Sequence, residues 1–267
     1  MLHHKEKEEE FVICESKLRD RKDKKMAEQL YTIPVNDAFA TECECPLCLM
    51  WKDLEKSAIE FTMGPSYMED DNREVTDKLG FCARHMEIMY RNKNKLGLAL
   101  MLKTHTDKTI REMKAIAEGE KPKAAGFFSK KTDKAPMIEY IEKLESTCFV
   151  CGRIQPVFDR YIDTIFHMWK KDKDFVEKFR SCKGFCTKHY GILYEAGASK
   201  LNQTQYDEFL AILNKVYFDN MDRLNADMSW FIDKHDYRNK TADWGTSRDS
   251  LQRALVKVGS TIIEEDS

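Results

Sequence analysis

Two cysteine pairs and two cysteine–histidine pairs are the residues of this sequence best suited to chemistry. Each Cys-x-x-Cys pair is followed by a Cys-x-x-His pair, after the 33 residues 49–81 in one case and the 34 residues 152–185 in the other. Thiolate sulfur and imidazole nitrogen are typical zinc ligands, and two intervening residues let both side chains reach one ion. The candidate metal ligands are Cys45, Cys48, Cys82, His85, Cys148, Cys151, Cys186 and His189.

The two sets of ligands form an internal repeat. A Gly-Phe pair precedes each Cys-x-x-His pair, at Gly80-Phe81 and at Gly184-Phe185. Because both spacings recur, we interpret the sequence as a tandem duplication. The repeat predicts two Zn²⁺ ions per chain, with one Cys₃His site inside each copy. The predicted groups are Cys45, Cys48, Cys82 and His85, and Cys148, Cys151, Cys186 and His189.

Three thiolates with one imidazole favour zinc, with iron as the main competitor. An iron–sulfur cluster that included Cys182 would lack a ligand in the first copy, where Lys78 stands at the matching position. Four protein ligands leave no position for water, which is typical of structural and not of catalytic zinc. We therefore assign no catalytic residue. Arg84 and Lys188 occupy equivalent positions and could offset the negative charge of the sites.

Composition excludes several classes of protein. The 267 residues include 44 basic and 46 acidic side chains, and a net charge of −2 does not favour a nucleic-acid partner. Nine cysteines, an odd number, disfavour a disulfide framework. The first ten residues are mostly charged and no apolar run reaches the ~20 residues of a membrane helix. We expect a cytoplasmic protein with no membrane partner.

Helical periodicity runs through nearly the whole sequence, and no alternating strand pattern is found. The predicted fold is all-α: two tandem helical zinc-binding repeats packed into one helical assembly with a C-terminal helix. One amphipathic helix is predicted over 84–118, with a break or a close helix contact at Gly97. Thr246 and Ser247 are candidate N-caps of the last helix, which contains Leu251, Leu255 and Val258. The expected segments are an N-terminal extension at 1–30, repeat 1 at 31–118, a Lys-rich linker at 119–135, and repeat 2 with the C-terminal helix at 136–267.

Four stretches of sequence resemble a bacterial family of unknown function that carries the same doubled pattern. They are Cys-Pro-Leu-Cys at 45–48, Gly-Phe-Cys-Ala-Arg-His at 80–85, Lys-Leu-Gly-Leu-Ala-Leu-Met-Leu at 95–102, and Asp236-Tyr237-Arg238 to Trp244-Gly245. The resemblance covers nearly all of the chain from Tyr31 onward. Some members bear the label of ABC transporter substrate-binding protein, and the resemblance implies no established activity.

The sequence favours a non-enzymatic protein whose two structural zinc sites stabilise a scaffold for an unknown protein partner. Two alternatives stay open: a thiol-based redox or metal sensor that uses the zinc-site cysteines, and a zinc-dependent enzyme. The thiols outside the ligand sets are Cys14, Cys43 and Cys182, and oxidation of Cys43 or Cys182 could link it to a ligand and expel metal. A homo-oligomer is compatible with the sequence.

Overall fold

The computed structural model describes residues 31–119 and 134–262, and every regular element within these ranges is a helix. This confirms the all-α prediction. In the same ranges, no helix combines the length and the apolar character needed to cross a membrane. The expected extension at 1–30, which contains Cys14, and most of the expected linker lie outside the described residues.

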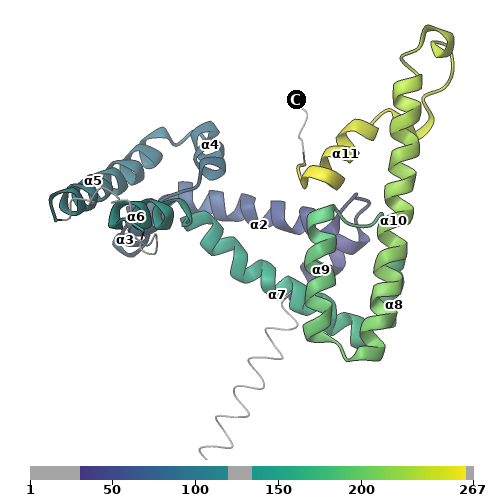
Figure 1. The fold of residues 1–267 in the computed structure, drawn as a ribbon, viewed down its shortest axis with the longest axis horizontal. Coiled ribbons are helices and arrows are strands. Elements are labelled where there is room, and N and C mark those ends of the chain that lie inside the picture. Colours follow the sequence, from purple (N-terminus) through teal and green to yellow (C-terminus); the bar gives the residue numbers. More distant parts are fainter. Residues whose placement is uncertain (1–30, 120–133, 263–267) are drawn as a thin grey trace, which may run out of the picture. The chain divides into compact units, whose positions relative to one another are not determined.

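The helices follow the same order in both halves of the chain (Figure 1). The first half has a helix over residues 31–40, then α2 (Pro46–Met63), a 3₁₀ turn η1 (Pro65–Met68), α3 (Asp70–Leu79), α4 (Ala83–Arg91) and α5 (Lys95–Gly119). The second half has α6 (Pro136–Glu145), α7 (Phe149–Lys171), α8 (Lys173–Ser181), α9 (Thr187–Lys200) and α10 (Gln203–Asp233). Two 3₁₀ turns, η2 (Tyr237–Asn239) and η3 (Gly245–Ser247), lead to a further helix, α11 (Ser250–Gly259). The matching order of the helices agrees with a tandem duplication.

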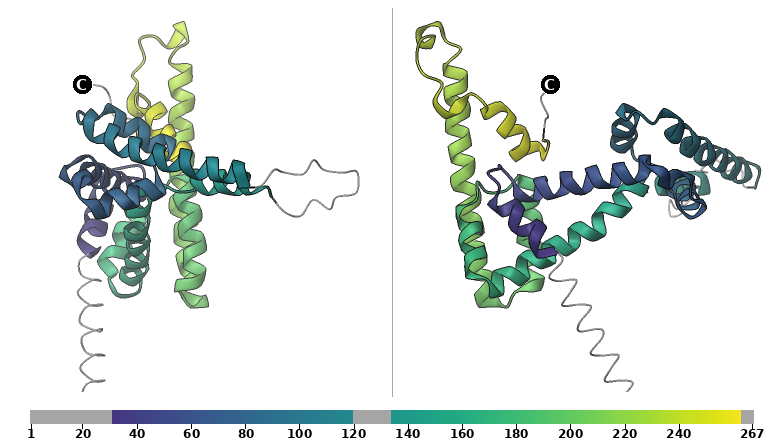
Figure 2. Two further views of the ribbon diagram at one scale, coloured as in Figure 1. Left: turned by 90° about the vertical axis from the view of Figure 1, so that its left-hand side faces the viewer. Right: turned by 180° about the vertical axis from the view of Figure 1, so that it is seen from behind.

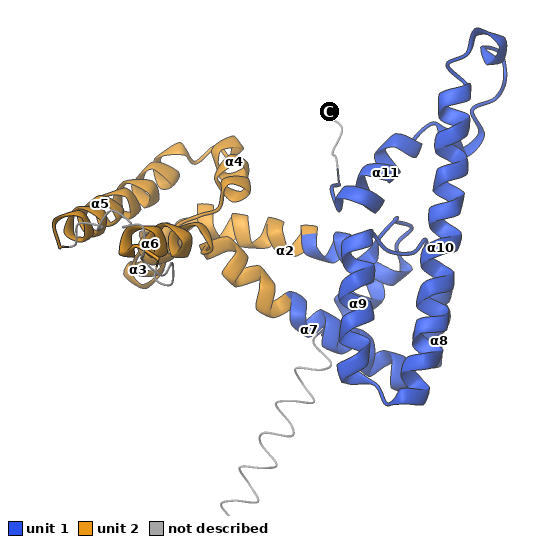
Figure 3. Cartoon of the chain, in the orientation of Figure 1, with its two compact units in different colours: residues 1–51, 158–267 blue, residues 52–157 orange. Residues whose placement is uncertain are grey.

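The chain forms two compact units (Figure 3). Unit 1 contains residues 1–51 and 158–267, and unit 2 contains residues 52–157. Helices α2 and α7 each begin in one unit and end in the other. Each unit therefore combines helices from both halves of the chain and cuts across the repeats expected from the sequence.

Aromatic side chains form the core of unit 1. The Phe39 ring lies 5.0 Å from that of Phe175, and the Phe179 ring lies 5.0 Å from that of Phe185, measured between ring centroids. All four are buried. Helices α9, α10 and α11 pack together in this unit (Figures 1 and 2). Because Phe185 immediately precedes Cys186, this core fixes the position of the second Cys-x-x-His pair.

In unit 2, α5 packs against α3, α4 and α6. The single helix expected over 84–118 is divided in two, because the chain leaves the helix at 92–94 between α4 and α5. The Asn94 side chain accepts a hydrogen bond from the Gly97 N–H over 2.9 Å and so starts α5. The helix does not break at Gly97, which lies within α5. This glycine is a point of close contact, because a Cβ atom there would lie 3.0 Å from a ring carbon of Tyr67.

The C-terminal helix differs from its expected form at its start and on its buried face. Asp249 precedes α11, whereas the expected N-caps Thr246 and Ser247 lie in η3. Two residues of α11 are fully buried, Ser250 and Lys257. Its apolar residues Leu251, Leu255 and Val258 are exposed.

Candidate metal centres

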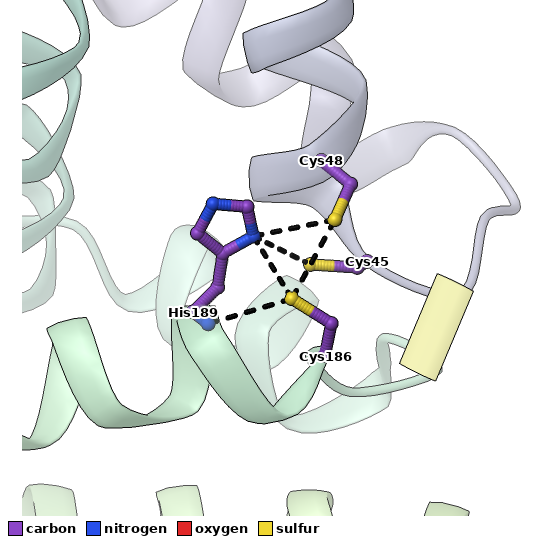
Figure 4. Close-up of side chains that lie close together, drawn as sticks. All are labelled: Cys45, Cys48, Cys186 and His189. Carbon is purple, nitrogen blue, oxygen red and sulfur yellow. Dashed lines mark hydrogen bonds between the residues drawn. The ribbon is translucent and has the colours of Figure 1, made fainter. Parts of the chain in front are cut away.

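Two groups of four side chains bring their sulfur and nitrogen atoms within 4.8 Å of one another. The unit 1 centre consists of Cys45, Cys48, Cys186 and His189 (Figure 4). The unit 2 centre consists of Cys82, His85, Cys148 and Cys151. Each centre lies wholly within one compact unit.

The eight candidate ligands all lie in these centres, but the expected grouping is wrong. Each centre takes its Cys-x-x-Cys pair from one repeat and its Cys-x-x-His pair from the other. Helix length gives the physical reason. The 18 residues of α2 span about 27 Å from a start at the first Cys-x-x-Cys pair, and the 10 residues of α3 are too few to return Cys82 to the start of α2. The 23 residues of α7 and the 9 residues of α8 produce the same separation in the second repeat.

In both centres the Nδ1 atom of the histidine faces the three sulfurs. His189 Nδ1 lies 3.4 Å from Cys45 Sγ, 3.3 Å from Cys48 Sγ and 3.1 Å from Cys186 Sγ, and the last two sulfurs are 3.6 Å apart. Figure 4 shows these side chains converging from the starts of two helices.

The unit 2 centre has nearly the same dimensions. His85 Nδ1 lies 3.2 Å from Cys82 Sγ, 3.3 Å from Cys148 Sγ and 3.4 Å from Cys151 Sγ. The Cys82 and Cys151 sulfurs are 4.0 Å apart. Regular tetrahedral zinc with ordinary bond lengths requires about 3.8 Å between two sulfurs and about 3.6 Å between sulfur and nitrogen. Both donor sets therefore fit one tetrahedral ion each.

Helix starts supply a favourable field at each centre. Cys82 occupies the N-cap position of α4, and Cys186 occupies that of α9, where its sulfur accepts a hydrogen bond from the His189 N–H. The Cys-x-x-Cys pairs lie at the starts of α2 and α7. The positive end of a helix dipole stabilises thiolates, so two helix starts favour the ionised sulfurs that bind metal.

A glycine with positive φ turns the chain into each Cys-x-x-His pair. Gly80 has φ 58° and Gly184 has φ 83°. The space beside each of them is also filled, since a Cβ atom on Gly80 would lie 2.5 Å from the imidazole of His105. The Gly-Phe signature of the repeat thus has a local cause: the glycine makes the turn and the buried phenylalanine anchors it.

The unit 2 histidine is held from behind by a carboxylate. His85 Nε2 lies 3.1 Å from Glu55 Oε1, and Arg84 donates two hydrogen bonds of 2.8 Å and 2.9 Å to the same carboxylate. Burial works against the charge of Glu55, but the bonds from His85 and Arg84 outweigh it and lower its pKa to about 2. Burial likewise disfavours the His85 cation, whereas the bonds with Cys148 and Glu55 raise its pKa to about 10. A carboxylate behind the ring orients a metal-binding histidine and increases its basicity.

The unit 1 histidine has an apolar neighbour instead. Ten residues after the first cysteine of each Cys-x-x-Cys pair, the first repeat has Glu55 and the second has Phe158. The Phe158 ring lies 5.5 Å from that of His189. His189 Nε2 is buried and has no hydrogen-bond partner among the described residues. The two centres have the same types of ligand but differ in the residues that surround the histidine.

Helix α11 adds polar groups to the unit 1 centre that the sequence analysis did not identify. Lys257 Nζ donates to the Glu44 carbonyl oxygen over 2.7 Å, donates to the Lys183 carbonyl oxygen, and lies 3.3 Å from the Glu44 carboxylate. Burial lowers the pKa of Lys257, and Glu44 opposes this effect. Ser260 Oγ donates to Cys186 Sγ over 3.1 Å.

The expectation that Arg84 and Lys188 offset the charge of the sites holds in part. The thiolates of Cys82 and Cys151 contribute to the raised pKa of Arg84, although its hydrogen bond with Glu55 is the larger cause. The Lys188 ammonium instead lies 5.2 Å from the centre of the Trp51 ring. The lysine beside the unit 1 ligands is Lys257, whose cation interacts favourably with Cys45.

These observations define the class: an all-α protein with two Cys₃His groups that could each hold a metal ion. The chain belongs to a family described as "Family of unknown function (DUF6062)", whose profile matches residues 26–265. That description carries no transporter label. No curated protein and no solved structure matches the chain.

Proposed function

We propose that this protein is a non-enzymatic zinc-binding scaffold in which both Cys₃His centres are structural. The observation that carries the proposal is that four protein side chains surround each centre at tetrahedral spacing. A closed set of four ligands leaves no site for a reactive water, so it favours a structural metal. The centres join distant segments, since Cys48 and Cys186 are 138 residues apart and Cys82 and Cys151 are 69 apart. A metal ion at each centre would cross-link these distant segments of the chain.

Zinc is the metal that we propose for both centres. Zn²⁺ binds thiolate and imidazole ligands well, and in structural sites it is almost always tetrahedral. The protein purified under reducing conditions should contain two zinc ions per chain by elemental analysis. Removal with a chelator should lower the midpoint of thermal unfolding. One zinc ion or none would overturn the proposal.

A variant outside the centres provides the control. Cys43 is only two residues from the ligand Cys45, yet its sulfur belongs to neither group. Cys43→Ser should therefore retain two zinc ions, whereas Cys45→Ser should lose one. If Cys43→Ser also lost metal, the ligand assignment would be incorrect.

A reducing compartment such as the cytoplasm and a protein partner are part of the proposal. Metal–thiolate centres need reduced cysteines, which supports the compartment. The proposal of a protein partner is supported by α11, which exposes three apolar side chains to solvent. A partner captured by the wild-type protein should be lost when Leu251, Leu255 and Val258 are all replaced by Glu. Retention would exclude this surface of α11, and size-exclusion chromatography with light scattering would test the homo-oligomer.

The sensor alternative based on Cys43 or Cys182 has little support. Burial raises the pKa of the Cys43 thiol, and burial raises that of Cys182 to about 11. Both thiols are therefore protonated at neutral pH and react slowly with oxidants. Among the described cysteines, the ligands themselves are therefore the better candidates for reaction, and they differ between the two centres.

A further inference from the structure

We propose that the unit 2 centre is a redox modification site, at which a hydroperoxide joins Cys82 and Cys151 in a disulfide while the unit 1 centre keeps its ligands. This inference rests on the proposed function, because it assumes that both centres bind zinc. It adds a difference between two centres that have identical ligand types.

The ligand residues of the two centres differ in their exposure. In unit 1, all four ligands are buried, and Cys186 is 0% exposed. In unit 2, Cys82 and Cys151 are partly exposed, while His85 and Cys148 are buried. An oxidant must reach a sulfur before it can react, so the unit 2 centre offers two points of attack.

Additional groups cover the unit 1 centre. Ser260 donates to Cys186 Sγ, and Phe158 packs against the His189 ring. Lys257 fills the space between the two loops that carry the ligands and is itself fully buried. The corresponding cation of the unit 2 centre is Arg84, whose side chain is 60% exposed. Access to the unit 1 sulfurs is thus restricted by Lys257, Ser260 and Phe158.

The distance between the exposed sulfurs suits disulfide formation. Cys82 Sγ and Cys151 Sγ are 4.0 Å apart and come from separate helices, α4 and α7, so rotation of their side chains can close the gap. Cys148 is the less favourable partner because it is buried. Its sulfur accepts a hydrogen bond from the Cys151 N–H over 3.5 Å and faces His85 Nδ1 at 3.3 Å.

The reaction balances with one hydroperoxide. One thiolate attacks the distal peroxide oxygen, the O–O bond breaks, and a sulfenic acid forms while the leaving oxygen takes a proton. The second thiolate attacks the sulfenic sulfur, the S–S bond forms, and hydroxide leaves and is protonated to water. Two electrons pass from the sulfurs to the peroxide, and two protons are consumed. With hydrogen peroxide the product is two waters.

The disulfide removes two of four metal ligands. Cys148 and His85 alone cannot complete a tetrahedral zinc site, so the metal should leave unit 2. The zinc is neither oxidised nor reduced. One oxidation event would thereby release one ion and replace one cross-link by another between the same two helices.

The test uses the full-length protein loaded with two zinc ions and an excess of hydrogen peroxide. A chromogenic chelator measures zinc release, and alkylation followed by peptide mass spectrometry identifies the oxidised cysteines. We expect one zinc ion per chain to leave at least about tenfold faster than the second, together with a Cys82–Cys151 disulfide. Simultaneous release of both ions, or oxidation of Cys45, Cys48 or Cys186 first, would overturn the inference.

A matched variant removes Cys43 and Cys182, the two non-ligand thiols among the described residues. The double variant Cys43→Ser/Cys182→Ser should release its first zinc at the wild-type rate, and loss of the fast phase in this variant would refute the assignment. Failure of the scaffold proposal looks different. In that case the purified protein would hold fewer than two zinc ions before any oxidant is added.

Discussion

The Phe149 N–H donates a hydrogen bond to the Gly80 carbonyl oxygen over 2.9 Å and joins the two ligand loops of the unit 2 centre. The equivalent position in the first repeat is Pro46, which has no N–H to donate. Unit 1 joins its loops through the Lys257 side chain instead, which binds the carbonyl oxygens of Glu44 and Lys183. A backbone bond and a buried lysine thus serve the same purpose in the two centres.

Replacement of Lys257 by Met should destabilise unit 1 by about 3 kcal/mol, because the Glu44 carbonyl and the Lys183 carbonyl would lose a charged donor. Urea denaturation measures the loss. The control is Lys215→Met, since Lys215 pairs with Asp219 on the surface of α10, 2.7 Å away. That change should cost less than about 1 kcal/mol. Equal losses in the two variants would show that Lys257 has no special role.

The exchange of ligands between repeats can be tested by counting zinc in two double variants. Cys45→Ser/Cys186→Ser damages one centre and should retain one zinc ion per chain. Cys45→Ser/Cys82→Ser damages both centres and should retain none. If each repeat held its own metal, the two results would be reversed, so the pair of variants contains its own control.

Replacement of Glu55 by Ala should weaken zinc binding at the unit 2 centre by roughly tenfold to a hundredfold, because His85 loses the carboxylate that orients it. Competition with a chelator should show one weakened ion and one unchanged ion. Glu87→Ala is the control, because Glu87 is an exposed residue that pairs with Arg91. Weakening of both ions would indicate general destabilisation and contradict a local effect.

Gly80→Ala should destabilise the protein by about 1–3 kcal/mol, through its positive φ and the contact with His105. Gly191→Ala is a matched substitution in α9, where nothing lies within 4 Å of the added Cβ atom. There we expect a gain of about 0.5–1 kcal/mol from helix propensity. Thermal unfolding of both variants gives the comparison. Destabilisation by Gly191→Ala, or no effect of Gly80→Ala, would be inconsistent with this account.

Local pattern was enough to predict the all-α class and to select the eight residues that the structure brings together. Local pattern could not decide which Cys-x-x-Cys pair joins which Cys-x-x-His pair. The two repeats have nearly the same spacing between these pairs, so either combination satisfies the pattern. The answer depends on the lengths of α2 and α7 beyond their cysteines, and therefore on where each helix ends. Helix ends are the least certain part of any sequence-based assignment.

Lys257 and Glu55 could not be found from the sequence for a different reason. An amphipathic pattern predicts that apolar residues face the core, whereas α11 buries its lysine and exposes Leu251, Leu255 and Val258. The burial of Lys257 is favourable because its ammonium group donates to the carbonyl oxygens of Glu44 and Lys183 in the ligand loops. No local sequence pattern identifies these two acceptors. Alignment of the repeats gives no signal for Glu55, since its counterpart is Phe158.

Shared ligands make the two repeats comparable to the subunits of a homodimer, in which neither subunit binds metal without the other. A dimer of two single repeats could form both centres by the same exchange of ligand pairs. A protease recognition sequence inserted at Gly126 would recreate that state. After cleavage, the half-molecules should elute together on size exclusion while metal is bound. They should separate, or lose their structure, once a chelator removes it.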